Sequence, residues 1–505
     1  MEFKPTHAGQ LVMVDIEGTS LDADTAFFLQ QHHVRAVCLF RKNMGSADEV
    51  RQLTADLRAV MGPHALIGID QEGGSVIRAT FLPQAPAAMA LGAIGDVALA
   101  EQVGAAVSRG LRSLGINWNF APVLDVNNNP ANPVIAERSF SADPHAVANL
   151  AGAWMQGAMS QGVACCVKHF PGHGDTHMDS HHALPVVDKS LNELEQLELI
   201  PFRALASTAP AVMTAHIVYP RIDPEHPATL SHKVLTGILR EAIGYRGVVI
   251  TDALMMKAVY DRYGHARAAV LTLQAGADLV LAQGAREEQL AALNAIRDAM
   301  QSGALEADAM QQACARVDAL AQAFPSVAAP YSAEHIAADE QLMQEAWVRS
   351  LTAVGAPQAP ALSRPLRVIT QGAVVSDGVS EAGLPLDEVR GLFANFADVQ
   401  YLALPELRRL QADQVPVDHR LNVLVSNQRT RYGAGAALAP IDLHCVVWNP
   451  FQTMDIAAPA VVTWGYAAGA LRALRLWLGG DAHATGTAPV ALHHPPLHLT
   501  TKEIA

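Results

Sequence analysis

Eight short apolar runs, each about as long as a β-strand, recur through the first two thirds of this 505-residue chain with helix-like stretches between them. The runs occupy residues 11–15, 35–40, 65–70, 116–121, 163–170, 211–216, 247–252 and 278–282. Strands that helices cover on both faces form parallel sheets. Eight such units make up a (β/α)8 barrel. We therefore predict an α/β protein whose residues 1–334 form a barrel.

One intervening helix has the expected period, because Val103, Val107, Leu111 and Leu114 fall at spacings of four, four and three. Beyond the barrel, residues 335–354 read as a helix, and the Ala/Pro-rich segment APQAPALSRP that follows favours an extended chain. We predict that residues 335–365 form this helix and a linker. Five more strand-like runs (366–370, 399–404, 421–426, 443–448 and 460–464) predict a smaller doubly wound α/β domain over residues 366–505.

Composition excludes several classes of protein. The chain is 50% hydrophobic and 17% charged, which is typical of globular proteins. Its formal charge of -14 disfavours binding to nucleic acid or to a membrane surface. Five scattered cysteines without CxxC pairs indicate neither a disulfide framework nor a zinc finger. With no signal segment and no apolar run of membrane-spanning length, we expect a soluble cytoplasmic protein of undetermined oligomeric state.

Several predicted barrel strands end in polar residues: Asp15, Asp70, Lys168 with His169, His216 and Asp252. In a (β/α)8 barrel the carboxyl ends of the strands meet at one face, which carries the active site. Residues far apart in the sequence would therefore converge there. Polar residues also commonly begin loops, but their recurrence at five strand ends favours an active face.

The densest cluster of functional side chains is KHFPGHGDTHMDSHHALP, residues 168–185. Its proline and glycines disfavour a helix, so the segment is predicted to be a loop after the fifth strand. It could be a solvated polar turn. It could also bind a metal through His173, His177 and His181, although that spacing shares one face only on a helix. A third interpretation pairs Asp179 with His181, whose imidazole can both donate and accept a proton near neutral pH.

Asp252 ends the apolar run of the seventh strand and is the candidate nucleophile opposite this pair. It could instead cap the helix that follows. A carboxylate nucleophile with a separate acid/base is the arrangement of retaining glycosidases. Polar groups that could orient a sugar ring stand on or near other strand ends, namely Asp70, Arg78, Arg138, Lys168 and His169.

The segments GIDQEGGSVIR, NFAPVLDV, ERSFSADP, KHFPGHGDTHMDSH and VVITDALMMKAV, in this order, resemble glycoside hydrolase family 3, and in particular its bacterial β-N-acetylglucosaminidase (β-hexosaminidase) branch. The resemblance spans about residues 8–330. It implies Asp252 as nucleophile and His181 as proton donor and acceptor, with Asp179 as its partner. It also implies that Asp70, Arg78, Arg138, Lys168 and His169 bind N-acetylglucosamine. No metal or other cofactor is implied, and the C-terminal part resembles the family's α/β sandwich domain.

The resemblance implies a retaining exo-enzyme that removes terminal β-linked N-acetylglucosamine, with cell-wall fragments of peptidoglycan recycling as the expected small-molecule substrate. A phosphorylase on the same site, or a broader β-glycosidase, is an alternative. A metal-dependent hydrolase and a non-catalytic sugar-binding protein are further alternatives. At Ser75, Ser141 and Ala253 the chain departs from the family pattern, which commonly has arginine, glycine and an acidic residue there.

Overall fold

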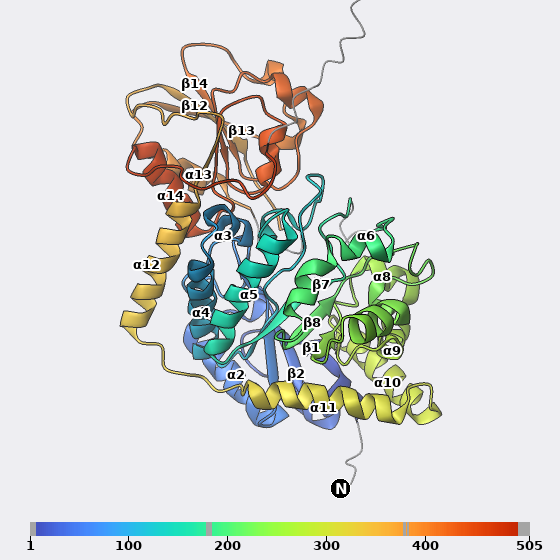
Figure 1. The fold of residues 1–505 in the computed structure, drawn as a ribbon. Helices are drawn as coiled ribbons and strands as arrows, with labels where there is room; N and C mark the ends of the chain where they lie inside the picture. Colours follow the sequence, from blue (N-terminus) through green and yellow to red (C-terminus); the bar gives the residue numbers. More distant parts are fainter. Residues whose placement is uncertain (1–6, 178–183, 377–379, 381–382, 493–505) are drawn as a thin grey trace, which may run out of the picture.

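The computed structural model describes residues 7–177, 184–376, 380 and 383–492. It contains a barrel domain and a smaller C-terminal α/β domain, joined by the long helix α12 (Figure 1). The strands of the barrel sheet are β1 (Val12–Asp15), β2 (Ala36–Leu39), β3 (Leu66–Ile69), β6 (Trp118–Asn119), β7 (Ala164–Phe170), β8 (Ala211–Thr214), β9 (Val248–Ile250) and β10 (Val280–Leu281).

These eight strands are parallel and follow the order β10-β1-β2-β3-β6-β7-β8-β9. A parallel bridge between Ile250 and Leu279 brings β9 next to β10 and nearly closes the ring. Each strand coincides with one of the apolar runs, which confirms the predicted barrel. Inward-facing side chains such as Met13, Leu66 and Trp118 fill its interior.

Helices surround the barrel on its outer side (Figure 1). The apolar stripe predicted on α4 is buried, since Val103, Val107 and Leu111 are at most 5% exposed. The helical elements of this domain are α1 (Ala23–Gln31), α2 (Ala47–Met61), α3 (Ala88–Ile94), α4 (Val97–Ser113), α5 (Pro144–Ser160), α6 (Leu191–Glu195), α7 (Leu199–Leu205), the π-helix η5 (Lys233–Ala242), α8 (Lys257–Tyr263), α9 (His265–Ala275), α10 (Arg286–Ser302) and α11 (Ala307–Ala323).

A two-stranded hairpin that the sequence did not reveal follows β3. Its strands are β4 (Gln71–Gly73) and β5 (Val76–Ile77). Gly73 and Gly74 both have positive φ, at 110° and 60°, and a Cβ atom at Gly73 would lie 2.4 Å from a backbone oxygen of Pro86. Only glycine meets both requirements at this position. The hairpin therefore lies tightly against the segment before α3.

The prediction of a helix through residue 354 was wrong at its end. Helix α12 (Ala333–Ser350) stops at Leu351, whose backbone is no longer helical, and β11 (Thr352–Val354) follows. This strand pairs antiparallel with β16 (Ala460–Val462). The residues LTAV could form either the end of a helix or an edge strand, because both can bury apolar side chains. Pairing with β16 stabilises the strand.

The C-terminal sheet has the order β11-β16-β15-β14-β12-β13 and is parallel except for β11. Its other strands are β12 (Leu366–Gln371), β13 (Val399–Leu404), β14 (Leu421–Ser426) and β15 (Leu443–Val446), and its helices are α13 (Leu386–Leu392) and α14 (Ala468–Gly479). The five predicted strands are confirmed. Because β12 lies between β13 and β14, the strand order reverses at β12, as in doubly wound sheets.

One apolar cluster spans the two domains. Met89 and Ala136 of the barrel belong to the same buried cluster as Trp347 of α12 and Trp464 of the C-terminal domain. Helix α12 packs against α3 and α4 on one side and α14 on the other, as Figure 1 shows. Among the described residues, no helix is both long enough and apolar enough to cross a bilayer.

Candidate active site

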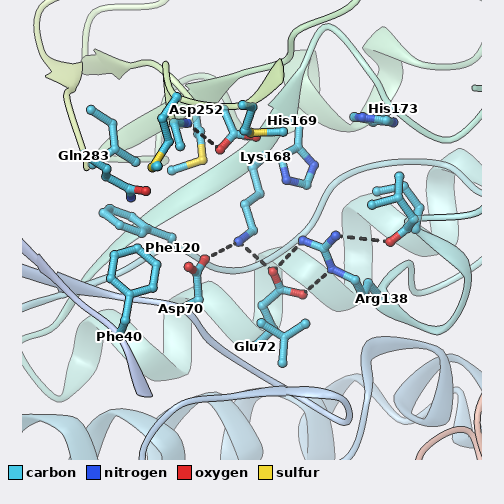
Figure 2. Close-up of a pocket in the computed structure, with 18 of the residues that line it drawn as sticks. Phe40, Asp70, Glu72, Phe120, Arg138, Lys168, His169, His173, Asp252 and Gln283 are labelled. Atoms are coloured by element: carbon cyan, nitrogen blue, oxygen red, sulfur yellow. Dashed lines mark hydrogen bonds and ion pairs between the residues drawn. The ribbon is translucent and has the colours of Figure 1, made fainter. Parts of the chain in front are cut away.

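A pocket of about 370 Å³ opens at the carboxyl ends of the barrel strands. Seven of the eight strands or the residues just after them contribute to its lining, which is drawn in Figure 2. These contributions are Phe40 after β2, Asp70 after β3, Phe120 after β6, Lys168 and His169 on β7, Met213 on β8, Asp252 after β9, and Leu281 with Gln283 at β10. The sequence positions that were expected to converge therefore do so.

Every predicted site residue that the structure describes lines this pocket: Asp70, Arg78, Arg138, Lys168, His169 and Asp252. The predicted pair Asp179 and His181 lies outside the described residues. Two polar strand ends are not in the lining. Asp15 binds Lys42 at 2.8 Å and accepts a hydrogen bond from the backbone of Gly284, and His216 bonds Thr229 and the carbonyl oxygen of Ala253.

An ion-pair network forms one wall of the pocket, as the dashed lines in Figure 2 show. The Nζ atom of Lys168 lies 2.7 Å from Oδ1 of Asp70 and 2.6 Å from Oε1 of Glu72. Arg138 binds both carboxylate oxygens of Glu72, at 2.8 and 2.7 Å. Arg78 lies 3.7 Å from Oδ2 of Asp70. The network fixes three cations and two carboxylates at positions where a bound molecule can hydrogen-bond to them.

Glu72 and Lys168 stay charged across the neutral pH range. Burial of Glu72 opposes its ionised form, but the adjacent charges of Arg138 and Lys168 outweigh burial and hold the pKa of Glu72 well below its usual range. Burial likewise opposes the charge of Lys168, and Asp70 and Glu72 outweigh it, so the pKa of Lys168 is raised. The wall therefore offers fixed charge-assisted donors and acceptors suited to hydroxyl groups.

A carboxylate–imidazole pair that sequence reasoning missed stands beside this network. Asp125 is fully buried, and its Oδ2 lies 2.6 Å from Nδ1 of His169. Its Oδ1 accepts the backbone N–H groups of His169 and His173, at 3.1 and 2.6 Å. Burial opposes the ionised form of Asp125, but the charge of His169 and these hydrogen bonds lower its pKa. Asp125 therefore fixes the orientation of the His169 ring in the pocket lining.

His173 also lines the pocket and is held as a neutral ring. Its Nδ1 lies 2.9 Å from the hydroxyl of Thr176. Burial, reinforced by the nearby charge of His169, lowers the pKa of His173 to about 4. His177 uses its Nδ1 differently, accepting from the side-chain amide of Asn129 at 3.1 Å. In the described part of the chain, no three His, Cys, Asp or Glu side chains are grouped as metal ligands.

Asp252 lies at the pocket two residues after β9 (Figure 2). Its Oδ1 accepts the backbone N–H of Ala253 at 2.7 Å, and the carbonyl of Ala253 is in turn bonded by His216 at 3.0 Å. Apolar side chains, including Phe40, Phe120, Met213 and Met255, line other parts of the pocket. A carboxylate, an oriented imidazole, fixed charges and apolar surface together suit a ring that carries many hydroxyls on an apolar body.

Two pocket positions were missed, Glu72 and Asp125, and His173 was considered only as a possible metal ligand. Glu72 and Asp125 stood in segments quoted for the family resemblance, and each is an ionisable residue within an otherwise apolar or glycine-rich run. A carboxylate in such a position is buried only when it is paired. That signal could have marked both as members of an ion-pair network.

Comparison with known proteins places the barrel domain in a family. Residues 6–320 match the model of the glycosyl hydrolase family 3 N-terminal domain. A β-hexosaminidase of Chromobacterium violaceum is 41% identical over 295 residues, which cover 56% of this chain and 82% of that protein. β-Hexosaminidase A of Pseudoalteromonas piscicida is 38% identical over 288 residues. That alignment takes in 52% of this chain but about half, 48%, of that longer protein.

Among solved structures, the likeness extends to the C-terminal domain. A glycoside hydrolase family 3 β-N-acetylglucosaminidase from Paenibacillus sp. str. FPU-7 superimposes with a TM-score of 0.85 at 34% identity, covering 96% of this chain and 98% of that one. The match includes both domains in the same order. This chain is a glycoside hydrolase and belongs to glycosyl hydrolase family 3.

Proposed function

We propose that this protein is a retaining exo-β-N-acetylglucosaminidase that acts on terminal, nonreducing β-linked N-acetylglucosamine. The observation that carries the proposal is the convergence of Asp252 with five predicted sugar-binding residues on a single pocket. The relatives named β-hexosaminidase and the structurally similar β-N-acetylglucosaminidase support the choice of sugar. A volume of about 370 Å³ suits one amino-sugar with part of its aglycone.

In the proposed reaction, a carboxylate oxygen of Asp252 attacks C1 of the sugar and forms a covalent glycosyl-enzyme. His181, paired with Asp179, protonates the departing glycosidic oxygen. The same histidine then takes a proton from water, and the resulting hydroxide displaces Asp252 from C1. Both histidine and its partner are proposed from the family resemblance. An imidazole suits the role because its pKa lets it give and take a proton at neutral pH.

The charged wall would bind the sugar before and during both steps. Lys168 and Asp70 present a donor and acceptors at 2.7 Å from each other, so they could hydrogen-bond neighbouring hydroxyls. His169, oriented by Asp125, would add one more such contact. These interactions fix the ring relative to Asp252, and such orientation contributes a large part of enzymatic rate enhancement.

We further propose that the natural substrates are cell-wall fragments in which N-acetylglucosamine is linked to a muramic-acid residue, and that the enzyme acts in the cytoplasm. Phosphorolysis remains an alternative outcome of the same chemistry, because phosphate could replace water as the second nucleophile. A broader β-glycosidase would differ only in how strongly it prefers the N-acetyl group.

The test compares a chromogenic N-acetyl-β-glucosaminide with the matching β-glucoside, each with and without phosphate and with a metal chelator. We expect turnover of the N-acetyl substrate, a kcat/KM for the glucoside lower by about 100-fold or more, release of free sugar rather than sugar 1-phosphate, and no effect of chelator. Asp252→Ala should bind the sugar without turning it over. Equal activity on both substrates, or a phosphate-dependent sugar 1-phosphate, would overturn the respective part of the proposal.

A further inference from the structure

The C-terminal domain reaches the pocket through a buried glutamate of the barrel. Segment 132–138, in the loop after β6, supplies Val134, Ile135 and Arg138 to the pocket lining. Glu137, in the same segment, is fully buried. Its Oε1 accepts the indole N–H of Trp448 at 3.0 Å, across the domain boundary. A pocket wall of the barrel is thus hydrogen-bonded to the second domain.

The same oxygen of Glu137 connects a third part of the molecule. It accepts the hydroxyl of Ser75 at 2.6 Å, and Ser75 lies in the turn of the β4–β5 hairpin. This hairpin carries Glu72, Val76 and, one residue beyond it, Arg78, which all line the pocket. One carboxylate therefore joins the hairpin, segment 132–138 and the C-terminal domain. Because the carboxylate is buried, water cannot replace a lost donor, and the loss of either bond is costly.

A second residue of the C-terminal domain forms a hydrogen bond to segment 132–138. A guanidinium nitrogen of Arg429 donates to the backbone oxygen of Val134 at 2.5 Å, and another lies 3.3 Å from the hydroxyl of Ser380. The guanidinium carbon of Arg429 is 6.0 Å from the centre of the Trp448 ring. The two side chains thus form one surface against the backbone and the carboxylate of the barrel segment.

Arg429 and Trp448 lie at the same edge of the C-terminal sheet. Arg429 follows β14 and Trp448 follows β15, so both stand at the carboxyl ends of parallel strands. In doubly wound sheets this edge, at the reversal of strand order, is where ligands bind. Here the edge is occupied by contacts to the barrel. The C-terminal domain uses its usual ligand-binding edge to hold a pocket wall.

Segment 132–138 also supports the start of the histidine-rich loop. The side-chain amide of Asn132 donates to the backbone oxygens of His173 and Gly174, at 2.8 and 3.0 Å. Its Oδ1 accepts the backbone N–H groups of Val134 and Ile135. A displacement of the segment would therefore move the pocket wall and the base of that loop together.

We propose that Trp448 and Arg429 are positioning residues, through which the C-terminal domain holds segment 132–138 where sugar binding requires it. The proposal rests on the pocket being the sugar site proposed above. The wall would contact the sugar in both the bound substrate and the transition state. Its displacement therefore weakens the binding of both states by the same amount. Such a loss raises KM and leaves kcat nearly unchanged.

The test is Trp448→Phe, which keeps an aromatic ring but removes the N–H donor together with part of the indole. We expect KM for the chromogenic N-acetyl-β-glucosaminide to rise about five- to tenfold, the factor that corresponds to the net contribution of one typical hydrogen bond, with kcat changed less than about twofold. Ser75→Ala removes the other donor to Glu137 and should raise KM similarly. In the double variant, KM should rise by less than the product of the two single-variant factors, because both substitutions act on one carboxylate.

Trp464→Phe is the matched control. Trp464 is fully buried in the C-terminal domain, and its indole N–H donates to the backbone oxygen of Ser350 at 2.8 Å, away from the pocket. This variant should lose stability and keep the wild-type KM. The inference is contradicted if Trp448→Phe keeps KM within twofold of wild type, or if both tryptophan variants raise KM equally. A wild-type enzyme without activity on the N-acetyl substrate would instead refute the proposed function.

Should Trp448→Phe not fold, Ser75→Ala alone still tests the role of Glu137. Its KM should rise while its thermal unfolding temperature, measured on the full chain, stays close to that of wild type. An unchanged KM in a folded Ser75→Ala protein would overturn the role assigned to the shared carboxylate.

Discussion

Oδ2 of Asp125 lies 2.6 Å from Nδ1 of His169, and the carboxylate is fully buried. The same residue accepts two backbone N–H groups of the β7 end and the loop that follows. Asp125→Asn keeps the size of the side chain but replaces one acceptor oxygen with an amide N–H donor. That donor would face the ring of His169 and the two backbone N–H groups, which are donors themselves. We expect a loss of stability on the order of 3 kcal/mol, because buried hydrogen-bonded charges tolerate no mismatch.

Urea denaturation of the variant measures this loss. Asp56→Asn is the matched control, since Asp56 is partly exposed and accepts one bond from the side chain of Gln52. The control should differ from wild type by less than about 0.5 kcal/mol. If both variants unfold at the wild-type urea concentration, Asp125 does not hold β7 as described.

Glu72 is the shared partner of Arg138 and Lys168, and its removal leaves two buried cations underpaired. We expect Glu72→Gln to destabilise the protein by about 3 to 5 kcal/mol. Glu195→Gln breaks a half-exposed pair with Arg203 and should cost less than about 1 kcal/mol. Comparable unfolding midpoints for the two variants would show that the wall tolerates loss of its central carboxylate.

His173 predicts a specific acid sensitivity. Its folded pKa of about 4 lies below the ordinary histidine value of 6.5, so the unfolded chain binds the proton more readily. The stabilising effect is present above pH 6.5 and is lost as pH falls towards 4. Between pH 7 and pH 5 the loss from this one group is about 2 kcal/mol.

The corresponding experiment measures the free energy of unfolding of wild type and His173→Gln at pH 7 and pH 5. The variant lacks this titration, so its stability should fall by about 2 kcal/mol less than that of wild type over the interval. An equal pH dependence in the two proteins would mean that His173 is not held neutral by burial.

The proposed proton transfer by His181 can be distinguished from the proposed sugar contact of His169 by varying the leaving group. His181→Ala should reduce kcat/KM about tenfold or less on an activated aryl glycoside, and by roughly 100- to 10,000-fold on an alkyl glycoside that needs protonation. His169→Ala removes a proposed sugar contact and should reduce both substrates equally. If His169→Ala shows the leaving-group dependence and His181→Ala does not, the pair Asp125 and His169 is the acid/base.

The barrel could be predicted from the sequence because its signal is local. Each strand is a short apolar run bounded by polar residues, and helical periodicity separates the runs. The β4–β5 hairpin escaped because strands of three and two residues carry no period. The end of α12 was misjudged because the choice between helix and strand at Thr352 depends on β16, more than 100 positions later.

The site was predictable to the extent that strand ends converge. Asp70, Lys168 and Asp252 could be placed together because each follows a barrel strand. The contact between Glu137 and Trp448 could not be predicted. The two residues are 311 positions apart, and the local sequence around either one does not indicate the other as its partner. Which domain edge faces the pocket is decided by tertiary packing alone.

Asp252 is proposed to form a covalent bond to the sugar. Incubation with an activated 5-fluoro N-acetylglucosaminyl fluoride, followed by mass spectrometry of the intact protein and its peptides, tests for this bond directly, because the fluorine slows hydrolysis of the glycosyl-enzyme. We expect one sugar per chain, attached to Asp252, and no labelling of Asp252→Ala. A label on another residue, or an active enzyme that accumulates no covalent sugar, would show that Asp252 is not the nucleophile.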